Sequence, residues 1–417
     1  MNADVFEKYE SEVRSYCRSF PSKFLIAKDC YIYSEDGKEY LDFFSGAGAL
    51  NYGHNNPYIK EKLLEYILND GITHALDMYT GAKEEFIETF QEKILKPRGL
   101  DYKMQFTGPT GTNAVEAALK RARNATGRQN VFALMGAFHG MTLGSLALTT
   151  AAGSRAGAGV TLNNVYHVPA PYMFPDMDVL EFIEKILSDK HSGVEKPAAF
   201  ILETVQIESG VHVLDVEFLQ EIRKICDKYG ILLIVDDIQA GCGRTGAFFS
   251  FEDAGIIPDM VTLSKSISGY GLPMAITLIK PEYDAWWDPG EHNGTFRGNQ
   301  HAFVTAKAGI EFALKESIYE KAGYAGDIAF GYLKEKLHAF NDIEIRGTGL
   351  IIGIDVKDET FAKDIVTKCF EKGLIIERTS NHSTTLKILP PLTIKYDDLM
   401  KGLNIIIDSI KEVKNNK

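Results

Sequence analysis

Short, continuous hydrophobic runs alternate with helical patterns through the middle of the chain. The two most prominent runs cover residues 231–235 and 260–263, and similar runs cover 131–134 and 198–202. None of them alternates with polar residues, which is typical of strands buried on both faces of a parallel sheet. From about residue 102 to 280, the pattern therefore predicts a mostly parallel sheet wrapped by helices.

The two ends of the chain carry different patterns. Near the N-terminus, the residues around Asp36-Gly37 predict a β-hairpin, because this dipeptide favours a tight turn. Asn56-Pro57 marks the start of an amphipathic helix. Beyond residue 350, three short hydrophobic runs and a closing helix from about Tyr396 predict a small α+β domain. The predicted division is an N-terminal segment that joins the small domain (1–55), a large domain (56–300) and the small domain itself (301–417).

Acidic and lysine side chains follow the two prominent runs. Asp236 and Asp237 come directly after the first run, and Ser264-Lys265 follows the second. Parallel strands deliver such residues to one edge of the sheet, where ligands bind. Pyridoxal phosphate needs both groups, a lysine for its Schiff base and a carboxylate that keeps its pyridine nitrogen protonated. The lysine must also lose its proton, which partial burial favours. By themselves, Asp236 and Lys265 are consistent with either a site for this cofactor or a structural ion pair.

A glycine-rich stretch after the first run matches a dinucleotide-binding loop by spacing alone. Gly241, Gly243 and Gly246 fit the G-x-G-x-x-G pattern. Such a loop should follow its strand at once and open a helix. Here five residues intervene, two of them acidic, and 247–251 does not begin a helix. The context disfavours a nicotinamide oxidoreductase, which is the alternative from another enzyme class.

Other residues at predicted strand ends and helix starts suit pyridoxal phosphate. The turn at 108–113 opens a helix, and the free N–H groups of such a turn favour a phosphate. Glu116, three residues after Asn113, predicts a capping box there. Taken singly, each of these residues also fits an ordinary turn or core position. The further candidates are Phe138 as a stacking ring, Glu203 as a third acid at the sheet edge, Gln239 as a hydrogen-bond partner of the ring and Thr295 as a loop hydroxyl.

Composition narrows the possible partners. The chain has 417 residues and a formal net charge of −12, which argues against a nucleic-acid partner. No hydrophobic run approaches the roughly 20 residues of a membrane span, and the N-terminus lacks a signal-peptide pattern. Five cysteines are scattered without a C-x-x-C pair, and the histidines show no metal-ligand spacing. We therefore expect a cytoplasmic protein with no membrane partner and no metal site.

Together these motifs resemble the class III (ω-amino) aminotransferases, which are pyridoxal phosphate enzymes of fold type I. The strongest matches are Asp236-Asp237-Ile238-Gln239, then Gly243-Arg244-Thr245-Gly246, and Thr262-Leu263-Ser264-Lys265. The resemblance extends from Gly46-Ala47-Gly48 to Leu389-Pro390-Pro391-Leu392, nearly the whole chain. It implies an aspartate aminotransferase-like α/β fold, with a mostly parallel seven-stranded sheet in the large domain and a small α+β domain.

The resemblance also implies a role for each matching residue. Lys265 would bind the cofactor and move the substrate proton, while Asp236 would hold the pyridine nitrogen. Glu208 would match the family's gate glutamate. Thr295 would reach the phosphate of the other subunit, because the family builds its sites across a homodimer interface. The other cofactor contacts would be Gly111 and Thr112 at the phosphate, Phe138 on the ring, Gln239 at the phenolic oxygen, and Glu203 nearby.

Longer stretches resemble one subgroup of this family, an aminotransferase of ectoine biosynthesis. They cover residues 13–21, 105–113, 266–273 and 291–299. This resemblance implies small amino and keto acids as substrates: L-glutamate would donate its amino group to L-aspartate 4-semialdehyde, giving L-2,4-diaminobutyrate and 2-oxoglutarate. Within the same fold, the alternative is another ω-aminotransferase, acting on ornithine, 4-aminobutyrate or a related amine.

The chain departs from the wider family at position 387 and within the run 206–210. An arginine that grips a carboxylate in many members is Lys387 here, which lacks the bidentate fork of arginine. The subgroup is similar in this respect. The run 206–210 carries isoleucine and serine where many members have glycine, which leaves its backbone and substrate selectivity open. We expect Glu208 and Lys387 to form a gate pair that opens when the carboxylate of glutamate binds.

Overall fold

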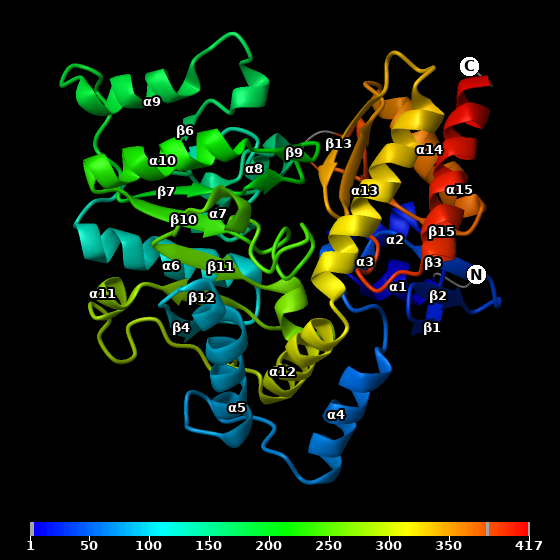
Figure 1. The fold of residues 1–417 in the computed structure, drawn as a ribbon, viewed down its shortest axis with the longest axis horizontal. Helices are drawn as coiled ribbons and strands as arrows, with labels where there is room; N and C mark the ends of the chain where they lie inside the picture. Colours follow the sequence, from blue (N-terminus) through cyan, green and yellow to red (C-terminus); the bar gives the residue numbers. More distant parts are fainter. Residues whose placement is uncertain (1–3, 381–382, 416–417) are drawn as a thin grey trace.

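A seven-stranded sheet forms the centre of the larger part of the molecule, at the left of Figure 1. The structure is a computed structural model that describes residues 4–380 and 383–415. β12 pairs antiparallel with both of its neighbours, and the other pairs are parallel. The predicted fold class is therefore confirmed. The strand order is β4 (Lys103–Phe106), β12 (Ile276–Ile279), β11 (Met260–Leu263), β10 (Leu232–Asp236), β7 (Ala199–Leu202), β5 (Val131–Leu134) and β6 (Val165–Val168).

The large sheet is buried on both faces, as its hydrophobic runs predict. Leu233 and Val235 of β10 belong to a core shared with helix α10 (Val216–Tyr229). Their neighbours along the strand belong to a second core, shared with α6 (Gly111–Thr126). Because successive side chains of a strand point to opposite faces, β10 contributes to both cores. This explains why the strands lack polar alternation.

The smaller part of the molecule combines the two ends of the chain. The predicted hairpin forms from β2 (Tyr31–Ser34) and β3 (Glu39–Asp42), with β1 (Phe24–Lys28) at its edge. β3 also pairs in parallel with β15 (Leu374–Ile375), so the N-terminal hairpin and the C-terminal part share one sheet. A second sheet has the order β13 (Glu344–Thr348), β14 (Ile351–Asp355), β17 (Thr385–Ile388) and β16 (Glu377–Arg378). Its covering helices include α14 (Glu359–Glu371) and α15 (Tyr396–Asn415).

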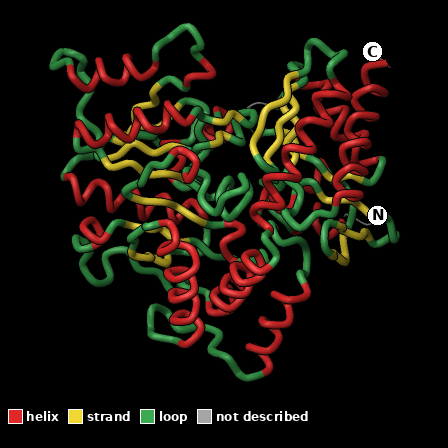
Figure 2. The backbone as a smooth tube through the Cα atoms, viewed as in Figure 1, coloured by secondary structure: helices red, strands yellow, loops and turns green. Residues whose placement is uncertain are grey.

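Two long helices connect these parts. α12 (Gln300–Lys315) packs against α4 (Pro57–Leu68) and α5 (Gly81–Phe90). α13 (Ile318–Leu337) begins with Ile318 in the core of the large sheet and ends with Leu337 in the core of the smaller part. Figure 2 shows loops gathered between the two sheets. No helix in the described ranges is long and apolar enough to cross a membrane.

The start of α6 differs from the prediction. The helix begins at Gly111, and the residue before it, Thr110, occupies the cap position without a side-chain cap bond. The predicted capping box of Asn113 and Glu116 is therefore wrong. The Glu116 carboxylate instead accepts a hydrogen bond from the Ser145 N–H at 3.0 Å, from a distant part of the chain. A tertiary contact has replaced the local one, which a sequence pattern cannot anticipate.

Candidate active site

The acid and the lysine predicted from the two runs lie in one cavity. β10 and β11 are adjacent and parallel, so that Asp236 and Lys265 both reach the carboxyl edge of the sheet. The cavity they share has a volume of about 180 Å³. Its lining residues are Gly111, Thr112, Phe138, His139, Gly140, Glu203, Val205, Asp236, Ile238, Gln239, Ala240, Ser264 and Lys265. Seven of the residues predicted for the cofactor are therefore brought together by the fold.

The carboxyl group of Asp236, which lines this cavity, is held by two neighbours. Its Oδ2 lies 2.7 Å from Nδ1 of His139, and its Oδ1 accepts a hydrogen bond from the Thr262 hydroxyl at 3.1 Å. Burial by itself would lower the pKa of His139, but the bond to Asp236 outweighs burial and raises it. His139 was missed by the sequence reasoning. Its only signal there was its position directly after Phe138.

Lys265 is placed by an unusual backbone conformation. It begins a short 3₁₀ turn just after β11, with a φ of 50°. Residues other than glycine rarely adopt this left-handed region, and such strain is concentrated at functional sites. Burial lowers the pKa of Lys265, although the nearby carboxylates of Glu208 and Asp236 oppose this. The ammonium is therefore easier to deprotonate than that of an exposed lysine.

The first turn of α6 closes one end of the cavity. The N–H groups of Gly111 and Thr112 lie in this turn, where the helix itself provides no acceptors. The Thr112 hydroxyl lies 2.7 Å from the Thr142 hydroxyl and 2.5 Å from that of Ser145. At Gly140, which has a φ of 128°, an added Cβ would lie 2.5 Å from the Thr112 hydroxyl oxygen. The sequence reasoning missed the hydroxyl cluster because isolated serines and threonines form no pattern.

Glu203 brings a second acid to the same cavity. It directly follows β7, and its carboxylate accepts a hydrogen bond from the Phe138 N–H at 3.0 Å. Burial raises the pKa of Glu203 to about 8; the charge of Asp236 adds to this, and His139 opposes it. At neutral pH Glu203 is therefore largely protonated.

The predicted gate pair forms an ion pair beside the cavity. The Lys387 Nζ lies 2.5 Å from Oε1 of Glu208. Gln239, which lines the cavity, donates to the same oxygen at 3.2 Å, and the Ser380 N–H donates to Oε2 at 3.0 Å. Burial would raise the pKa of Glu208, but the ammonium of Lys387 outweighs burial and lowers it to about 2. Glu208 is therefore a fixed negative charge.

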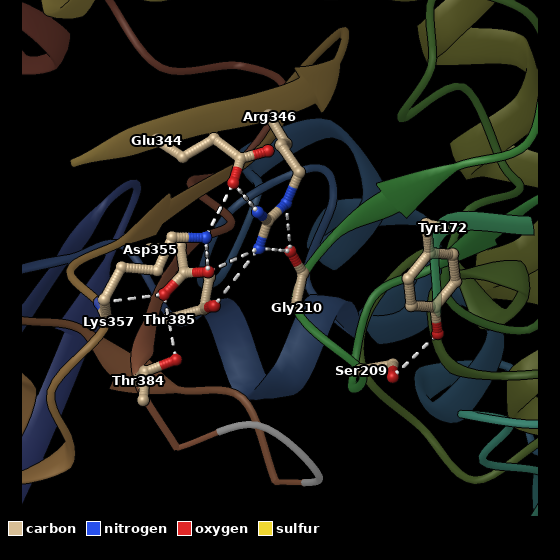
Figure 3. Close-up of polar contacts among 9 residues, drawn as sticks. All are labelled: Tyr172, Ser209, Gly210, Glu344, Arg346, Asp355, Lys357, Thr384 and Thr385. Atoms are coloured by element: carbon tan, nitrogen blue, oxygen red, sulfur yellow. Dashed lines mark hydrogen bonds and ion pairs between the residues drawn. The ribbon is translucent and has the colours of Figure 1, made fainter. Parts of the chain in front are cut away.

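The backbone of the run at 206–210 is held by the smaller part of the molecule (Figure 3). The Arg346 guanidinium, from β13, donates two hydrogen bonds to the Gly210 carbonyl, at 3.0 and 2.9 Å. It also pairs with Asp355 of β14 at 3.2 Å. On the other side, the Tyr172 hydroxyl donates to the Ser209 hydroxyl at 2.9 Å. The two residues that directly follow Glu208 are thereby fixed, through contacts that the sequence did not reveal.

Among the residues predicted to bind the cofactor, Thr295 is the one that does not line the cavity. It is exposed, in a loop that precedes α12. A neighbouring residue, Phe296, makes an edge-to-face contact with His74 at 5.5 Å between ring centroids. The predicted role of Thr295 in the site of another subunit stays a prediction.

The glycine-rich stretch at 241–246 has a structural role. Arg244 is fully buried, and its guanidinium donates to the side chain of Asn51 and to the carbonyls of Leu350 and Pro390. At Gly243, which has a φ of 93°, an added Cβ would lie 2.0 Å from the ring of Tyr319. No helix follows the stretch. It joins three distant parts of the chain and does not have the form of a dinucleotide-binding loop.

Comparison with known proteins agrees with this geometry. The model of the class III aminotransferases, a family of pyridoxal phosphate enzymes, matches residues 19–410. Two relatives named diaminobutyrate–2-oxoglutarate transaminase, from Halalkalibacterium halodurans and Vibrio cholerae, are each 52% identical, covering 99% and 97% of this chain and 97% and 98% of their own length. An aminotransferase structure from Bacillus anthracis has a TM-score of 0.88 at 25% identity, over 98% of this chain and 97% of that one. The chain therefore belongs to the class III aminotransferases.

Proposed function

We propose that this enzyme transfers the amino group of L-glutamate to the aldehyde carbon of L-aspartate 4-semialdehyde. The products are L-2,4-diaminobutyrate and 2-oxoglutarate. The observation that carries the aminotransfer is the meeting of Asp236 and Lys265 in one cavity at the sheet edge. The choice of substrates is supported by relatives about half identical over nearly the whole chain, which bear the name diaminobutyrate–2-oxoglutarate transaminase.

The residues of the cavity fit pyridoxal phosphate. Asp236 offers a carboxylate oriented by its contact with His139, which suits a protonated pyridine nitrogen. The first turn of α6 offers N–H groups and the Thr112 hydroxyl, which suit a phosphate. Phe138 and Gln239 would contact the ring, and Glu203 would lie near it. When bound, the cofactor withdraws electrons from the substrate carbon that carries the amino group.

The remaining chemistry belongs to side chains of this chain. Lys265 would hold the cofactor and move a proton at the substrate carbon, because its lowered pKa allows it to be neutral and act as a base. Glu208 covers Lys387, the cation available for a distal carboxylate. Glutamate carries such a carboxylate, so that Glu208 must leave Lys387 when glutamate binds. A gate of this kind would let one site accept two different substrates.

The wider setting is part of the same proposal. The enzyme would act as a homodimer in the cytoplasm, where its product would enter ectoine synthesis. All five cysteines are free thiols, which supports a reducing compartment. The pathway can be tested in cells that lack the gene, which should lose ectoine under salt stress and regain it when supplied with L-2,4-diaminobutyrate.

The decisive experiment is an absorbance spectrum of the protein loaded with pyridoxal phosphate. Lysine-bound cofactor gives a yellow band, which should disappear when L-2,4-diaminobutyrate is added without any keto acid. A band that persists with this diamine but disappears with ornithine or 4-aminobutyrate would show that the amino donor is another ω-amine. Absence of the band in cofactor-supplied protein would contradict the cofactor assignment.

A further inference from the structure

Lys387 contacts a second carboxylate besides Glu208. Glu377 lies directly opposite it in the antiparallel pairing of β16 with β17, and the Glu377 Oε2 lies 3.1 Å from the Lys387 Nζ. The lysine side chain is only 2% exposed, whereas those of Glu208 and Glu377 are 12% and 22% exposed. The ammonium is thus covered by two carboxylates. Of the three charged groups, Glu377 is the most accessible.

The two carboxylates differ in their remaining capacity to bind. Both oxygens of Glu208 accept hydrogen bonds, from Lys387 and Gln239 on one side and from Ser380 on the other. The buried Oε2 of Glu377 pairs with the Lys387 ammonium and has no second donor in the described ranges. Burial raises the pKa of Glu377, and the charge of Glu208 adds to this while Lys387 opposes it. A further cation would relieve this excess of negative charge.

The substrates proposed above differ in the group they place away from the reacting carbon. Diaminobutyrate reacts at its terminal amine, so that its far end carries an α-ammonium and an α-carboxylate; aspartate semialdehyde is the same in this respect. Glutamate reacts at its α-amine, and its far end carries a carboxylate alone. We propose that Glu377 binds the α-ammonium of diaminobutyrate and aspartate semialdehyde and so selects them over ω-amines without that group. This inference rests on the proposed function.

The location of the three charges supports this assignment. Gln239 lines the cofactor cavity and hydrogen-bonds Glu208, so that the charged cluster lies next to the cavity that contains Lys265. One ammonium between two carboxylates leaves one net negative charge, which attracts a cation and repels a lone carboxylate. Glutamate therefore needs Glu208 to move away, whereas diaminobutyrate brings its own cation. Glu377 would bind diaminobutyrate, and Glu208 would control the binding of glutamate.

The test compares L-2,4-diaminobutyrate with 4-aminobutyrate, which is the same molecule without the α-amino group. Their rates of bleaching the cofactor band, measured at several concentrations, give kcat/KM for each half-reaction. The holoenzyme should prefer diaminobutyrate by about 10- to 100-fold, the factor expected for a hydrogen bond between charged groups. In Glu377→Gln this preference should fall to a few-fold, while the kcat/KM for glutamate should not decrease.

Two further variants separate recognition from a structural effect. Glu377→Asp retains the charge and should restore part of the preference. Glu359→Gln removes an equal charge from an exposed side chain that pairs with Arg378, the next residue of β16, and should leave the preference unchanged. The inference is overturned if Glu377→Gln keeps the full preference, or if its kcat/KM falls equally for all substrates. In either case the proposed function stands. If the unaltered enzyme bleaches only with 4-aminobutyrate, the proposed function fails as well.

Discussion

Single side chains in the cavity acquire their properties from burial and from one or two neighbours. Asp236 and Glu203 are both buried carboxyl groups, yet His139 stabilises the charge of the first, while the second is left to desolvation. Burial raises the pKa of Glu203 to about 8, and a carboxyl group with a strongly raised pKa in a cavity is typical of functional sites.

Lys265 should be indispensable for turnover. Lys265→Ala removes both the group that holds the cofactor and the base that moves the substrate proton. Turnover should fall by at least about 10³-fold in a coupled assay of 2-oxoglutarate formation from glutamate. Lys224→Ala, which removes an exposed cation from α10, is the control and should keep normal turnover. Near-normal activity of Lys265→Ala would contradict its assignment.

Glu203 should make the stability of the cofactor-free protein depend on pH. In the folded chain the pKa of Glu203 is raised from 4.5 to about 8, so that between these values the folded chain keeps a proton that the unfolded chain has lost. The free energy of unfolding therefore decreases as the pH rises through this window, by up to about 5 kcal/mol. Asp237, whose pKa burial raises to about 7, acts in the same direction.

Urea denaturation of the cofactor-free protein at several pH values tests this dependence. Glu203→Gln keeps the shape of the side chain and removes its titration. The variant should show a smaller loss of stability between pH 4.5 and 8, with the remainder due to Asp237. Superimposable profiles of the two proteins would mean that Glu203 does not titrate in this range.

At the scale of elements, the site depends on how the run at 206–210 is positioned against β17. Arg346 fixes the Gly210 carbonyl to the small sheet, in which β17 carries Lys387 (Figure 3). The two members of the gate pair therefore come from segments joined by the same contacts. Because the backbone after Glu208 is held, we expect Glu208 to move away from Lys387 by a change of its side chain.

Glu208→Gln should affect the two amino donors unequally. The neutral amide cannot pair with Lys387 as strongly. The distal carboxylate of glutamate can therefore displace it from the lysine more easily. We expect the ratio of kcat/KM for glutamate to that for diaminobutyrate to rise about tenfold, the effect of weakening one charged hydrogen bond. Glu221→Gln on α10, an exposed member of an ion pair, is the matched control. Equal changes for both donors would count against a gate.

At the scale of the whole molecule, the exposed apolar side chains are not evenly distributed. Several lie at the end of α4, between α4 and α5, or in the loop before α12; they are Leu68, Ile72, Met78, Tyr79 and Phe296. Tyr79 is fully exposed, and the ring contact between His74 and Phe296 joins the two segments. Contiguous apolar groups of this kind mark interaction surfaces. They support the proposed homodimer, and Thr295 directly precedes Phe296 in this group.

Thr295 should contribute to cofactor affinity only within the dimer. Light scattering should show a dimer, and Thr295→Ala should weaken pyridoxal phosphate binding about tenfold, the effect of one hydrogen bond to a charged phosphate. Its subunit association should be unchanged. Thr367→Ala, which removes an exposed hydroxyl from α14, should bind the cofactor normally. A fully active monomer would contradict this arrangement.

The sequence by itself determined the central sheet and the pair of residues at its edge. The hydrophobic runs at 131–134 and 260–263 form β5 and β11 with these bounds, and 231–235 differs from β10 by one residue. Local patterns were sufficient here, because a strand buried on both faces must be continuously apolar. The carboxyl edge of such a sheet then placed Asp236 and Lys265 together.

Only the tertiary structure decided which neighbours each site residue has. His139 meets Asp236, Arg346 meets Gly210, and Glu377 meets Lys387 through pairings that no local periodicity records. The first two pairs join residues far apart in sequence. The third depends on how β16 pairs with β17. The same reason explains the incorrect capping box, since Glu116 bonds a residue brought close by the fold. The residue types were sufficient to identify the chemistry. The neighbours that tune each site residue depend on contacts made by folding.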